Sequence, residues 1–305
     1  MDWGIHLPHM GVQASRDGLI VFAQRAEELG YHSGWVSDHI AWPADIASKY
    51  PYTPDGSFPA PQNLPWLDPI GTMFFVAGCT ERLKLGTTVL ILPYRPPVLT
   101  AKALSSLDVV SGGRLILGVG VGWMHEEFDV LGMPFDHRGL RSDEQLELFQ
   151  RLFTEAQPSY DGRFYTFPPV GFEPKPVQSP VPIWVGGNTE AAYRRVARFG
   201  RAFHAAFEPL EDVRTAWARV QELVQAEGRD PAGVTLSIRL YLDPGGSMPA
   251  AKSVAGSTEQ MLDTIGQWQG IGVSHVLFDA VARGGYDGRF AAMEQFMIEV
   301  APQVR

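Results

Sequence analysis

The stretch that decides the fold is residues 83–123, LKLGTTVLILPYRPPVLTAKALSSLDVVSGGRLILGVGVGW. It holds a β-rich run at 84–91, an amphipathic helical pattern at 97–111 and a second β-rich run at 114–119. Two strands joined through such a helix lie parallel in one sheet, because the helix carries the chain back across a face of that sheet. The stretch therefore predicts a strand–helix–strand unit of an α/β protein.

The same alternation extends along the whole chain. The other strand-like runs lie at 3–7, 34–37, 182–186, 202–206, 234–240 and 273–278. The other helical patterns lie near 17–29, 68–81, 138–155, 189–199, 210–227, 257–269 and 288–300. Eight strand–helix units predict a (β/α)8 TIM barrel, which we expect to form a single domain over residues 1–305. A doubly wound sheet is the alternative that eight regular units disfavour.

Two connections are longer than such units need. Residues 40–67 follow the second strand and are rich in proline and aromatic side chains. They therefore belong to the C-terminal mouth of the barrel, where barrel enzymes place their sites, and we expect them to line a pocket there. Residues 156–181 precede the fifth strand, and we expect either a structural hairpin packed on the barrel or a loop that lines the pocket, rather than an irregular solvated loop.

The composition limits the partners of the protein. The formal net charge is −9 and the pI is about 5.4, which argues against nucleic acid or an anionic membrane as a partner but leaves room for a local basic pocket. The single cysteine, Cys79, fits a reducing compartment and an inert, buried thiol. The N-terminus resembles no secretion signal and no apolar run is long enough to cross a bilayer, so we expect a cytoplasmic protein.

Three glycines alternate at the end of the fourth strand, at positions 118, 120 and 122. They are not a dinucleotide fingerprint, because the spacing is wrong, the strand is not the first, and we expect the next helix only from about residue 138. Two explanations remain. A flat ring over the barrel mouth approaches the backbone here, or the bulky leucines of the strand need small neighbours.

Other strand ends carry polar groups. The second strand ends in Asp38 and His39, a carboxylate beside an imidazole, although a capping aspartate next to a surface histidine is equally compatible. Thr87 and Thr88 interrupt an apolar strand, where a hydroxyl needs a partner. Gly186–Thr189 opens a helix whose free N–H groups suit a phosphate, unless it is only a capped helix. We predict no metal site.

These stretches together resemble the bacterial-luciferase-like family of flavin and deazaflavin enzymes. The resemblance rests on WVSDH at 35–39, on the whole of 83–123, and on PIWVGGNTEAAYRRVARFG at 182–200. It is strongest to the branch that depends on the deazaflavin coenzyme F420, and it weakens after about residue 205. It implies a luciferase-like barrel whose C-terminal mouth holds the tricyclic ring of F420 or, alternatively, of FMN.

The resemblance also implies roles for particular residues. It places a non-prolyl cis peptide between Thr88 and Val89, behind the ring. Asp38 and His39 would meet the polar edge of the ring and the reacting centre, with His39 managing the proton. The cofactor-binding segments are Gly120, Val121 and Gly122 along the ring, and Gly186, Gly187, Asn188 and Thr189 at the phosphate. The family also dimerises, which predicts a homodimer through the helical faces at 68–81 and 97–111.

The sequence departs from the family pattern at some positions. Trp123 stands where sugar-phosphate dehydrogenases of the family have a glutamate acid, Trp42 is offset from their tryptophan, and GRAFHAAF replaces their usual Gly-Asp-Gly-Trp. We therefore expect an oxidoreductase that transfers a hydride between F420 and a small organic substrate, with aromatic pocket walls. An FMNH2-dependent monooxygenase and a cofactor-binding protein without turnover are the alternatives.

Overall fold

The computed structural model describes residues 1–53, 55–281 and 285–304. Its strands form a closed parallel barrel, because β9 pairs with both β8 and β10 and completes the circle. The barrel strands are β1 (Asp2–His6), β2 (Ser33–Val36), β3 (Lys84–Thr87) with its continuation β4 (Leu90–Ile91), β5 (Leu115–Gly120), β8 (Ile183–Gly186), β9 (Ala202–Ala206), β10 (Thr235–Asp243) and β12 (Val273–Ala280). The predicted (β/α)8 barrel is confirmed.

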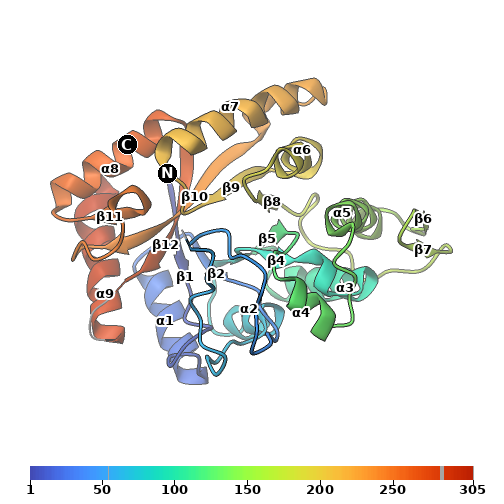
Figure 1. The fold of residues 1–305 in the computed structure, drawn as a ribbon, viewed down its shortest axis with the longest axis horizontal. Helices are drawn as coiled ribbons and strands as arrows, with labels where there is room; N and C mark the ends of the chain where they lie inside the picture. The colour runs from blue at the N-terminus through green and yellow to red at the C-terminus, as the bar shows by residue number, and fades with distance from the viewer. Residues whose placement is uncertain (54, 282–284, 305) are drawn as a thin grey trace.

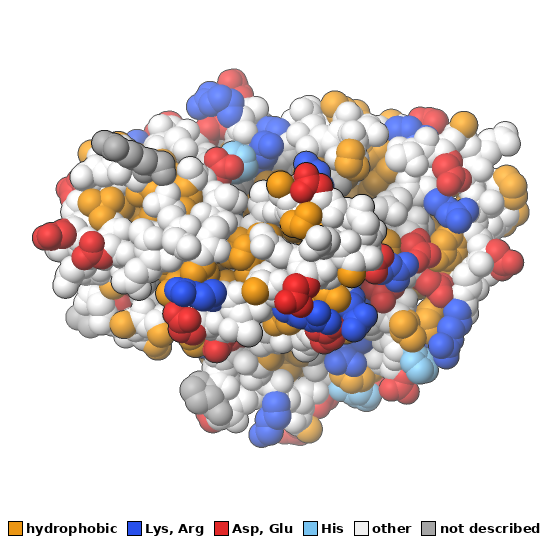
Figure 2. Space-filling model, turned by 90° about the horizontal axis from the view of Figure 1, so that it is seen from above, with side chains coloured by type: hydrophobic (Ala, Val, Ile, Leu, Met, Phe, Trp, Pro, Cys, Tyr) orange, Lys and Arg blue, Asp and Glu red, His pale blue; other side chains and the backbone are white. Residues whose placement is uncertain are grey.

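Helices follow the strands and surround the barrel (Figure 1). They are α1 (Arg16–Glu28), α2 (Pro69–Ala77), α3 (Pro97–Val110), α4 (His125–Val130), α5 (Arg138–Thr154), α6 (Glu190–Phe199), α7 (Leu210–Ala226), α8 (Thr258–Gly270) and α9 (Tyr286–Gln295). Among the described residues, no helix is long and apolar enough to cross a membrane. On the face seen in Figure 2, acidic and basic side chains are interspersed.

Three local predictions differ from the structure. The helix α4 begins at His125, directly after the glycine-rich end of β5, so the expectation of no helix before about residue 138 is wrong. The third strand is not one run over 84–91, because the cis peptide Thr88–Val89 separates β3 from β4. A short strand, β11 (Ser253–Ala255), also pairs with β10 outside the eight barrel strands.

The segment before β8 contains a small antiparallel hairpin, which was one of the two structures expected for it. Its strands are β6 (Tyr160–Asp161) and β7 (Thr166–Phe167), and it projects beyond α5 at the edge of the molecule (Figure 1). The Tyr160 hydroxyl donates to Glu147 Oε2 at 2.8 Å, so the hairpin is attached to α5 rather than to the mouth.

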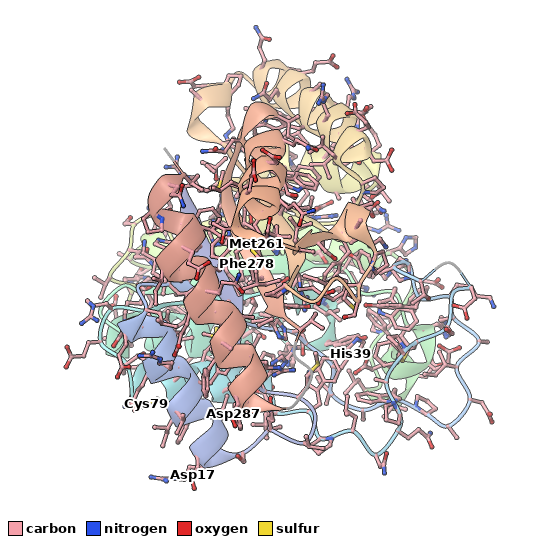
Figure 3. All side chains as sticks on the ribbon, turned by 90° about the vertical axis from the view of Figure 1, so that its left-hand side faces the viewer. Asp17, His39, Cys79, Met261, Phe278 and Asp287 are labelled. Atoms are coloured by element: carbon pink, nitrogen blue, oxygen red, sulfur yellow. The ribbon has the colours of Figure 1, made fainter. Side chains whose placement is uncertain are left out.

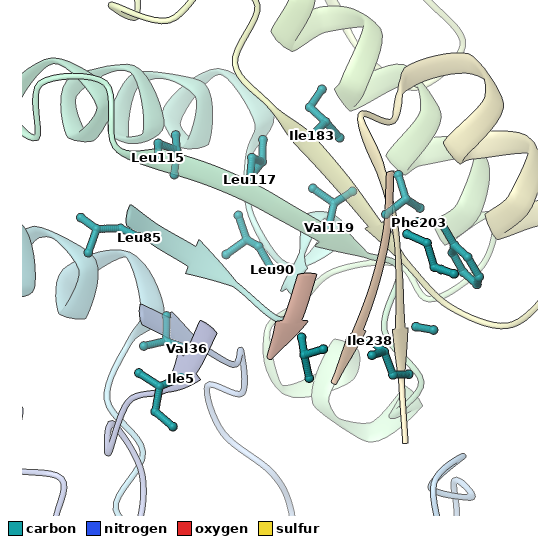
Figure 4. Close-up of a cluster of buried hydrophobic side chains, with 14 of the residues drawn as sticks. Ile5, Val36, Leu85, Leu90, Leu115, Leu117, Val119, Ile183, Phe203 and Ile238 are labelled. Atoms are coloured by element: carbon teal, nitrogen blue, oxygen red, sulfur yellow. The ribbon is translucent and has the colours of Figure 1, made fainter. Parts of the chain in front are cut away.

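Alternation along the strands divides the core into two layers. Leu115, Leu117 and Val119 point outward from β5 into the large cluster between barrel and helices (Figure 4). The opposite face points into the barrel, where Trp35 packs with four other side chains. A Cβ on Gly86 would lie 2.4 Å from the Trp35 ring, so the indole occupies the space that this glycine leaves. Trp35 thus forms part of the floor beneath the mouth.

The loop of residues 40–67, which we call the lid loop, crosses the mouth as predicted. At one end, Trp66 Nε1 donates to the Ser37 carbonyl at 3.2 Å, beside β2. In its middle, Lys252 Nζ donates to the Tyr52 carbonyl at 3.4 Å, from the segment that leads into β11. These contacts tie the loop to opposite sides of the barrel, with Pro54 lying outside the described residues.

Candidate active site

Asp38 lies buried just after β2, and both of its carboxylate oxygens have protein donors. Oδ2 accepts from the Ile91 N–H at 2.9 Å, and Arg95 binds both oxygens through Nη1 at 2.5 Å and Nη2 at 2.9 Å. Burial raises the pKa of the Asp38 carboxyl, and the Arg95 guanidinium opposes that rise. The pair therefore links the end of β2 to β4, and Asp38 acts first as a structural carboxylate.

His39, the next residue, points toward a carboxylate that the sequence analysis did not single out. Its Nδ1 lies 2.7 Å from Oε2 of Glu127, a fully buried side chain on α4. Glu127 Oε1 also accepts from the Ile40 and Ala41 N–H groups at 2.6 and 3.1 Å, and the Tyr94 hydroxyl donates to Oε2 at 2.8 Å. One carboxylate thus holds the imidazole, the start of the lid loop and Tyr94.

The charge state of Glu127 follows from these partners. Burial alone would raise the pKa of Glu127, but hydrogen bonds from His39, the Ile40 N–H and Tyr94 outweigh it, and the pKa is lowered. An ionised Glu127 accepts a hydrogen bond from His39 Nδ1. This bond leaves the other ring nitrogen, Nε2, free on the opposite side of the ring. Within the described part of the chain, Glu127 is the hydrogen-bond partner of His39, and Nε2 is available to a ligand.

Aromatic side chains surround the imidazole of His39. Its ring centroid lies 5.0 Å from those of Phe58 and Trp66, 5.8 Å from Trp42 and 6.1 Å from Trp123. Except for Trp123, these rings belong to the lid loop. They bury the histidine to 8% exposure and form apolar walls around it, as the sequence analysis expected. Trp123 therefore packs near the imidazole instead of supplying an acid.

The break between β3 and β4 faces the glycines of two other strands. A Cβ on Gly120 would lie 2.4 Å from Val89 Cγ2, and one on Gly186 would lie 2.8 Å from Val89 Cγ1. A Cβ on Gly118 would lie 1.8 Å from the Thr87 carbonyl oxygen. In this structure, the glycine run of β5 makes room for the β3–β4 connection rather than for the leucines of its own strand, so the explanation by those leucines is wrong. A cofactor contact for Gly120, Val121 and Gly122 stays a prediction.

The loop after β8 opens on a side cavity of about 230 Å³ between β9 and α7. Gly187 has a φ of +121°, and a Cβ there would lie 3.1 Å from the Ala192 Cβ, so this position suits glycine. Thr189 caps α6 by accepting from the Ala192 N–H at 3.3 Å. Gly187 and Asn188, directly before the capped start of α6, thus line the cavity, as a phosphate loop would.

Carboxylates line the same cavity. The Asn188 amide donates to Glu208 Oε1 at 2.9 Å, and Asp212 forms another part of the wall. Helix N–H groups attract an anion, whereas these carboxylates repel it. The cavity therefore combines the donors of a phosphate site with an opposing charge that the sequence analysis did not anticipate.

A second ion pair, half-buried and also missed from the sequence, lies at the mouth. Arg239 on β10 binds Asp279 on β12 through Nη2 at 3.1 and 2.9 Å, and its Nη1 donates to the Thr88 carbonyl at 3.3 Å. Cys79 lies apart from this region, at the end of α2 and on the opposite side from His39 in Figure 3. Burial raises the pKa of its thiol, which fits an inert residue.

Comparison with known proteins places this geometry in a family. The model of the luciferase-like monooxygenase family matches residues 5–262. The chain belongs to this luciferase-like family. An uncharacterized protein of Mycobacterium tuberculosis strain H37Rv is 38% identical over 223 residues, which are 73% of this chain and 75% of that protein. An F420-dependent glucose-6-phosphate dehydrogenase of Amycolatopsis mediterranei is 32% identical over 61% of this chain and 52% of its own length.

Solved structures share the luciferase-like fold at lower identity. An F420-dependent secondary alcohol dehydrogenase, in complex with an F420–acetone adduct, superposes with a TM-score of 0.80 at 18% identity and covers 100% of this chain and 99% of its own. The monooxygenase RslO1 from Streptomyces bottropensis has a TM-score of 0.79 at 22% identity, with 99% of both chains covered. At these identities the likeness establishes the fold of this luciferase-like chain.

Proposed function

We propose that this luciferase-like protein is an oxidoreductase that transfers a hydride between coenzyme F420 and a small organic substrate. The observation that carries the proposal is the pairing of His39 with the ionised Glu127 inside an aromatic wall at the barrel mouth. Such a pair fixes the orientation of an imidazole whose free nitrogen can give or take a proton. The F420-dependent relatives support the choice of cofactor.

The residues present fit a phosphorylated tricyclic cofactor. The capped start of α6 offers backbone N–H donors beside Gly187, where a Cβ would crowd Ala192 at 3.1 Å and a positive φ favours glycine. The Thr88 hydroxyl lies at the mouth beside Val89, where it can meet a polar edge of the ring. When bound, F420 supplies a carbon at its central ring position, which exchanges a hydride as two electrons at once.

The residues of the chain then divide the remaining work. Glu127 orients His39, so that Nε2 holds or receives the proton that accompanies hydride transfer. Asp38 and Arg95 position the end of β2 against β4, because both carboxylate oxygens of Asp38 already have protein donors. The rings of the lid loop exclude water from the imidazole, which strengthens its interaction with Glu127. The aromatic walls favour an apolar or ring-bearing substrate.

A flavin-dependent monooxygenase is the second candidate. The family model carries that description, and RslO1 shares the fold. Titrating the purified protein with F420 and, separately, with FMN, while following cofactor fluorescence, tests the choice. Tight binding of F420 with hydride exchange supports the proposal. Binding of FMN alone, with oxygen consumption in the presence of reduced FMN, would replace it by the monooxygenase, and binding without either reaction would leave a cofactor-binding protein.

Two substitutions at the side cavity should change cofactor affinity in opposite directions. Gly187→Val is expected to weaken binding about tenfold or more, because its side chain meets Ala192 and a valine disfavours φ of +121°. Glu208→Gln is expected to tighten binding severalfold by removing an opposing charge. Fluorescence titration of both variants, with circular dichroism to verify folding, measures these effects. Equal affinities in the native protein and both variants would mean that the start of α6 is a capped helix end and not a phosphate site.

We further propose that the protein is a homodimer through α2 and α3. Apolar side chains are exposed on these helices, at Phe75, Val98, Leu99, Val109 and Val110. Leu99, which is 68% exposed, would be buried by a second copy. Light scattering should therefore give a dimer mass for the native protein and a monomer mass for Leu99→Asp. A native monomer at micromolar concentration would contradict this arrangement.

A further inference from the structure

A chain of buried hydrogen bonds crosses the inside of the barrel from its floor to Thr88. Trp35 Nε1 donates to Ser33 Oγ at 2.8 Å, and Ser33 Oγ lies 3.1 Å from His275 Nε2. The remaining links are His275 Nδ1 to Ser237 Oγ at 2.9 Å, Ser237 Oγ to His204 Nδ1 at 2.9 Å, and His204 Nε2 to Thr88 Oγ1 at 3.0 Å. All six side chains are buried, and the proposed proton chemistry of His39 uses none of them.

Strand register explains why these residues meet. Ser237 on β10 lies opposite His204 on β9 and opposite His275 on β12. The three side chains therefore share one level on the inner face of the barrel. Ser33 extends the chain to Trp35 on β2, and Thr88 extends it to the end of β3.

The donors at the two ends decide the direction of the chain. The indole N–H of Trp35 can only donate, and so can Arg239 Nη1, which lies 3.5 Å from Thr88 Oγ1. Among the described residues, one hydroxyl hydrogen, that of Ser33, Ser237 or Thr88, is therefore left without an acceptor. If both histidines donated to Ser237, its hydrogen would be the unmatched one at a site of 0% exposure. If the hydrogens pointed toward the floor, Ser33 would accept twice, and among the described residues its own hydrogen would have no acceptor at a site of 0% exposure. If they point toward the mouth, the unmatched hydrogen belongs to Thr88.

We propose that this chain fixes the Thr88 hydroxyl as a hydrogen-bond donor directed into the cofactor site. The acceptor it would recognise is an oxygen or an unprotonated nitrogen on the polar edge of the bound ring, and this part of the inference rests on the proposed function. His204, Ser237, His275 and Ser33 are then positioning residues, which act through Thr88. An acceptor there removes the last unmatched hydrogen of a network that is otherwise complete.

The proposal requires both histidines to be neutral, with one hydrogen each. Burial, reinforced by Arg239, lowers the pKa of His204 to about 3, and burial also lowers the pKa of His275 well below its usual range. In the outward direction, His204 carries its hydrogen on Nε2 and His275 carries its hydrogen on Nδ1. In the opposite direction both tautomers are reversed, so the two arrangements are spectroscopically distinct.

Nitrogen-15 NMR of the histidine side chains in the cofactor-free protein tests the direction. Correlations between the ring carbon-bound hydrogens and the two nitrogens should show a protonated Nε2 in His204 and a protonated Nδ1 in His275. Reversed tautomers in both residues, or a protonated Nδ1 in both residues, would overturn the proposal. This measurement needs no cofactor, so its outcome is independent of whether F420 or FMN binds.

Variants then test whether the direction matters at the mouth. Thr88→Val removes the donor, and Thr88→Ser keeps it and serves as the matched control. Thr88→Val should weaken binding of the cofactor that the titration identifies by about twofold to tenfold, while Thr88→Ser binds within about twofold of the native protein. Ser33→Ala, which leaves the mouth intact, should give a mixture of His204 tautomers. Unchanged affinity in Thr88→Val, or a single unaltered tautomer in Ser33→Ala, would contradict the role of the chain.

Discussion

Replacing His39 with asparagine is expected to lower turnover about a hundredfold or more while leaving cofactor affinity within a few fold of the native value. Asparagine keeps a polar group beside Glu127, which is 2.7 Å from the native imidazole, but it cannot exchange a proton near neutral pH. The fold should survive, because Glu127 retains its other donors. Turnover under saturating substrate and cofactor affinity by fluorescence titration must be measured separately.

A second variant distinguishes proton chemistry from packing. Glu127→Gln keeps the volume but presents an amide to His39, which favours the wrong tautomer, so turnover should fall by at least about tenfold. The exposed His125, on the same helix, provides the control, since His125→Asn removes an imidazole outside the mouth. If His39→Asn retains turnover within about threefold of the native protein, His39 only packs against the aromatic wall, and substrate protons exchange with water.

The barrel could be predicted because its signals are local. Each strand is a short apolar run and each helix has its own period, so neither depends on knowing the partner strand. The polar groups at the strand ends were found for the same reason, since the C-terminal ends of parallel strands converge on one mouth. The resemblance added the location of the cis peptide, which no local pattern encodes, and the structure has it at Thr88–Val89.

Glu127 could not be predicted, because its role depends on a contact across 88 residues. In the sequence it is one of two adjacent glutamates, and a solvated helix surface would explain both equally well. The two glutamates have different surroundings in the structure. Glu127 is fully buried and hydrogen-bonded to His39, whereas Glu126 accepts from the N–H groups of Ala47 and Ser48 in the lid loop. Only the placement of α4 directly after β5, which we did not expect, reveals the difference.

The buried chain behind Thr88 left a weaker trace in the sequence. His204 and His275 each stand inside an apolar strand, where a polar side chain requires a partner. Both histidines share the partner Ser237, which is 33 residues from His204 and 38 residues from His275. The identity of this partner therefore depends on strand register rather than on composition. The glycine run of β5 is similar, because its neighbours Thr87 and Val89 become visible only when adjacent strands are aligned.

Buried histidines should also make the fold sensitive to acid. Burial lowers the pKa of His9 to about 4 and of His204 to about 3, and it lowers those of His6 and His275 well below 6.5. A histidine of this kind is protonated in the unfolded chain at a pH where it stays neutral in the fold. Unfolding therefore takes up protons, and stability falls as the pH drops below about 6.5 until each folded pKa is reached.

The expected size of this effect exceeds that of an ordinary substitution. Each such histidine contributes about 1.4 kcal/mol per pH unit, so four together give a slope of about 5 kcal/mol per unit near pH 5. A protein with a typical unfolding free energy of about 5–15 kcal/mol would lose its fold between about pH 5.6 and about pH 3.5. Glu127 adds to the loss only at lower pH. Its carboxylate begins to bind a proton in the unfolded chain near its ordinary pKa of 4.5, whereas its lowered pKa keeps it ionised in the fold.

Urea unfolding at pH values from about 7.5 to about 4.5, the range that the histidine pKa shifts select, measures the slope directly. Calorimetry in buffers of different ionisation enthalpy should then give an uptake of about four protons on unfolding near pH 5. His6→Gln, whose amide can still bond to the Ser37 hydroxyl that lies 2.8 Å from His6 Nε2, should reduce the slope by about a quarter, whereas His125→Gln should leave it unchanged. Stability that stays level between pH 7 and 5 would show that water reaches these imidazoles, and it would also remove the support that their neutrality lends to the hydrogen-bond chain ending at Thr88.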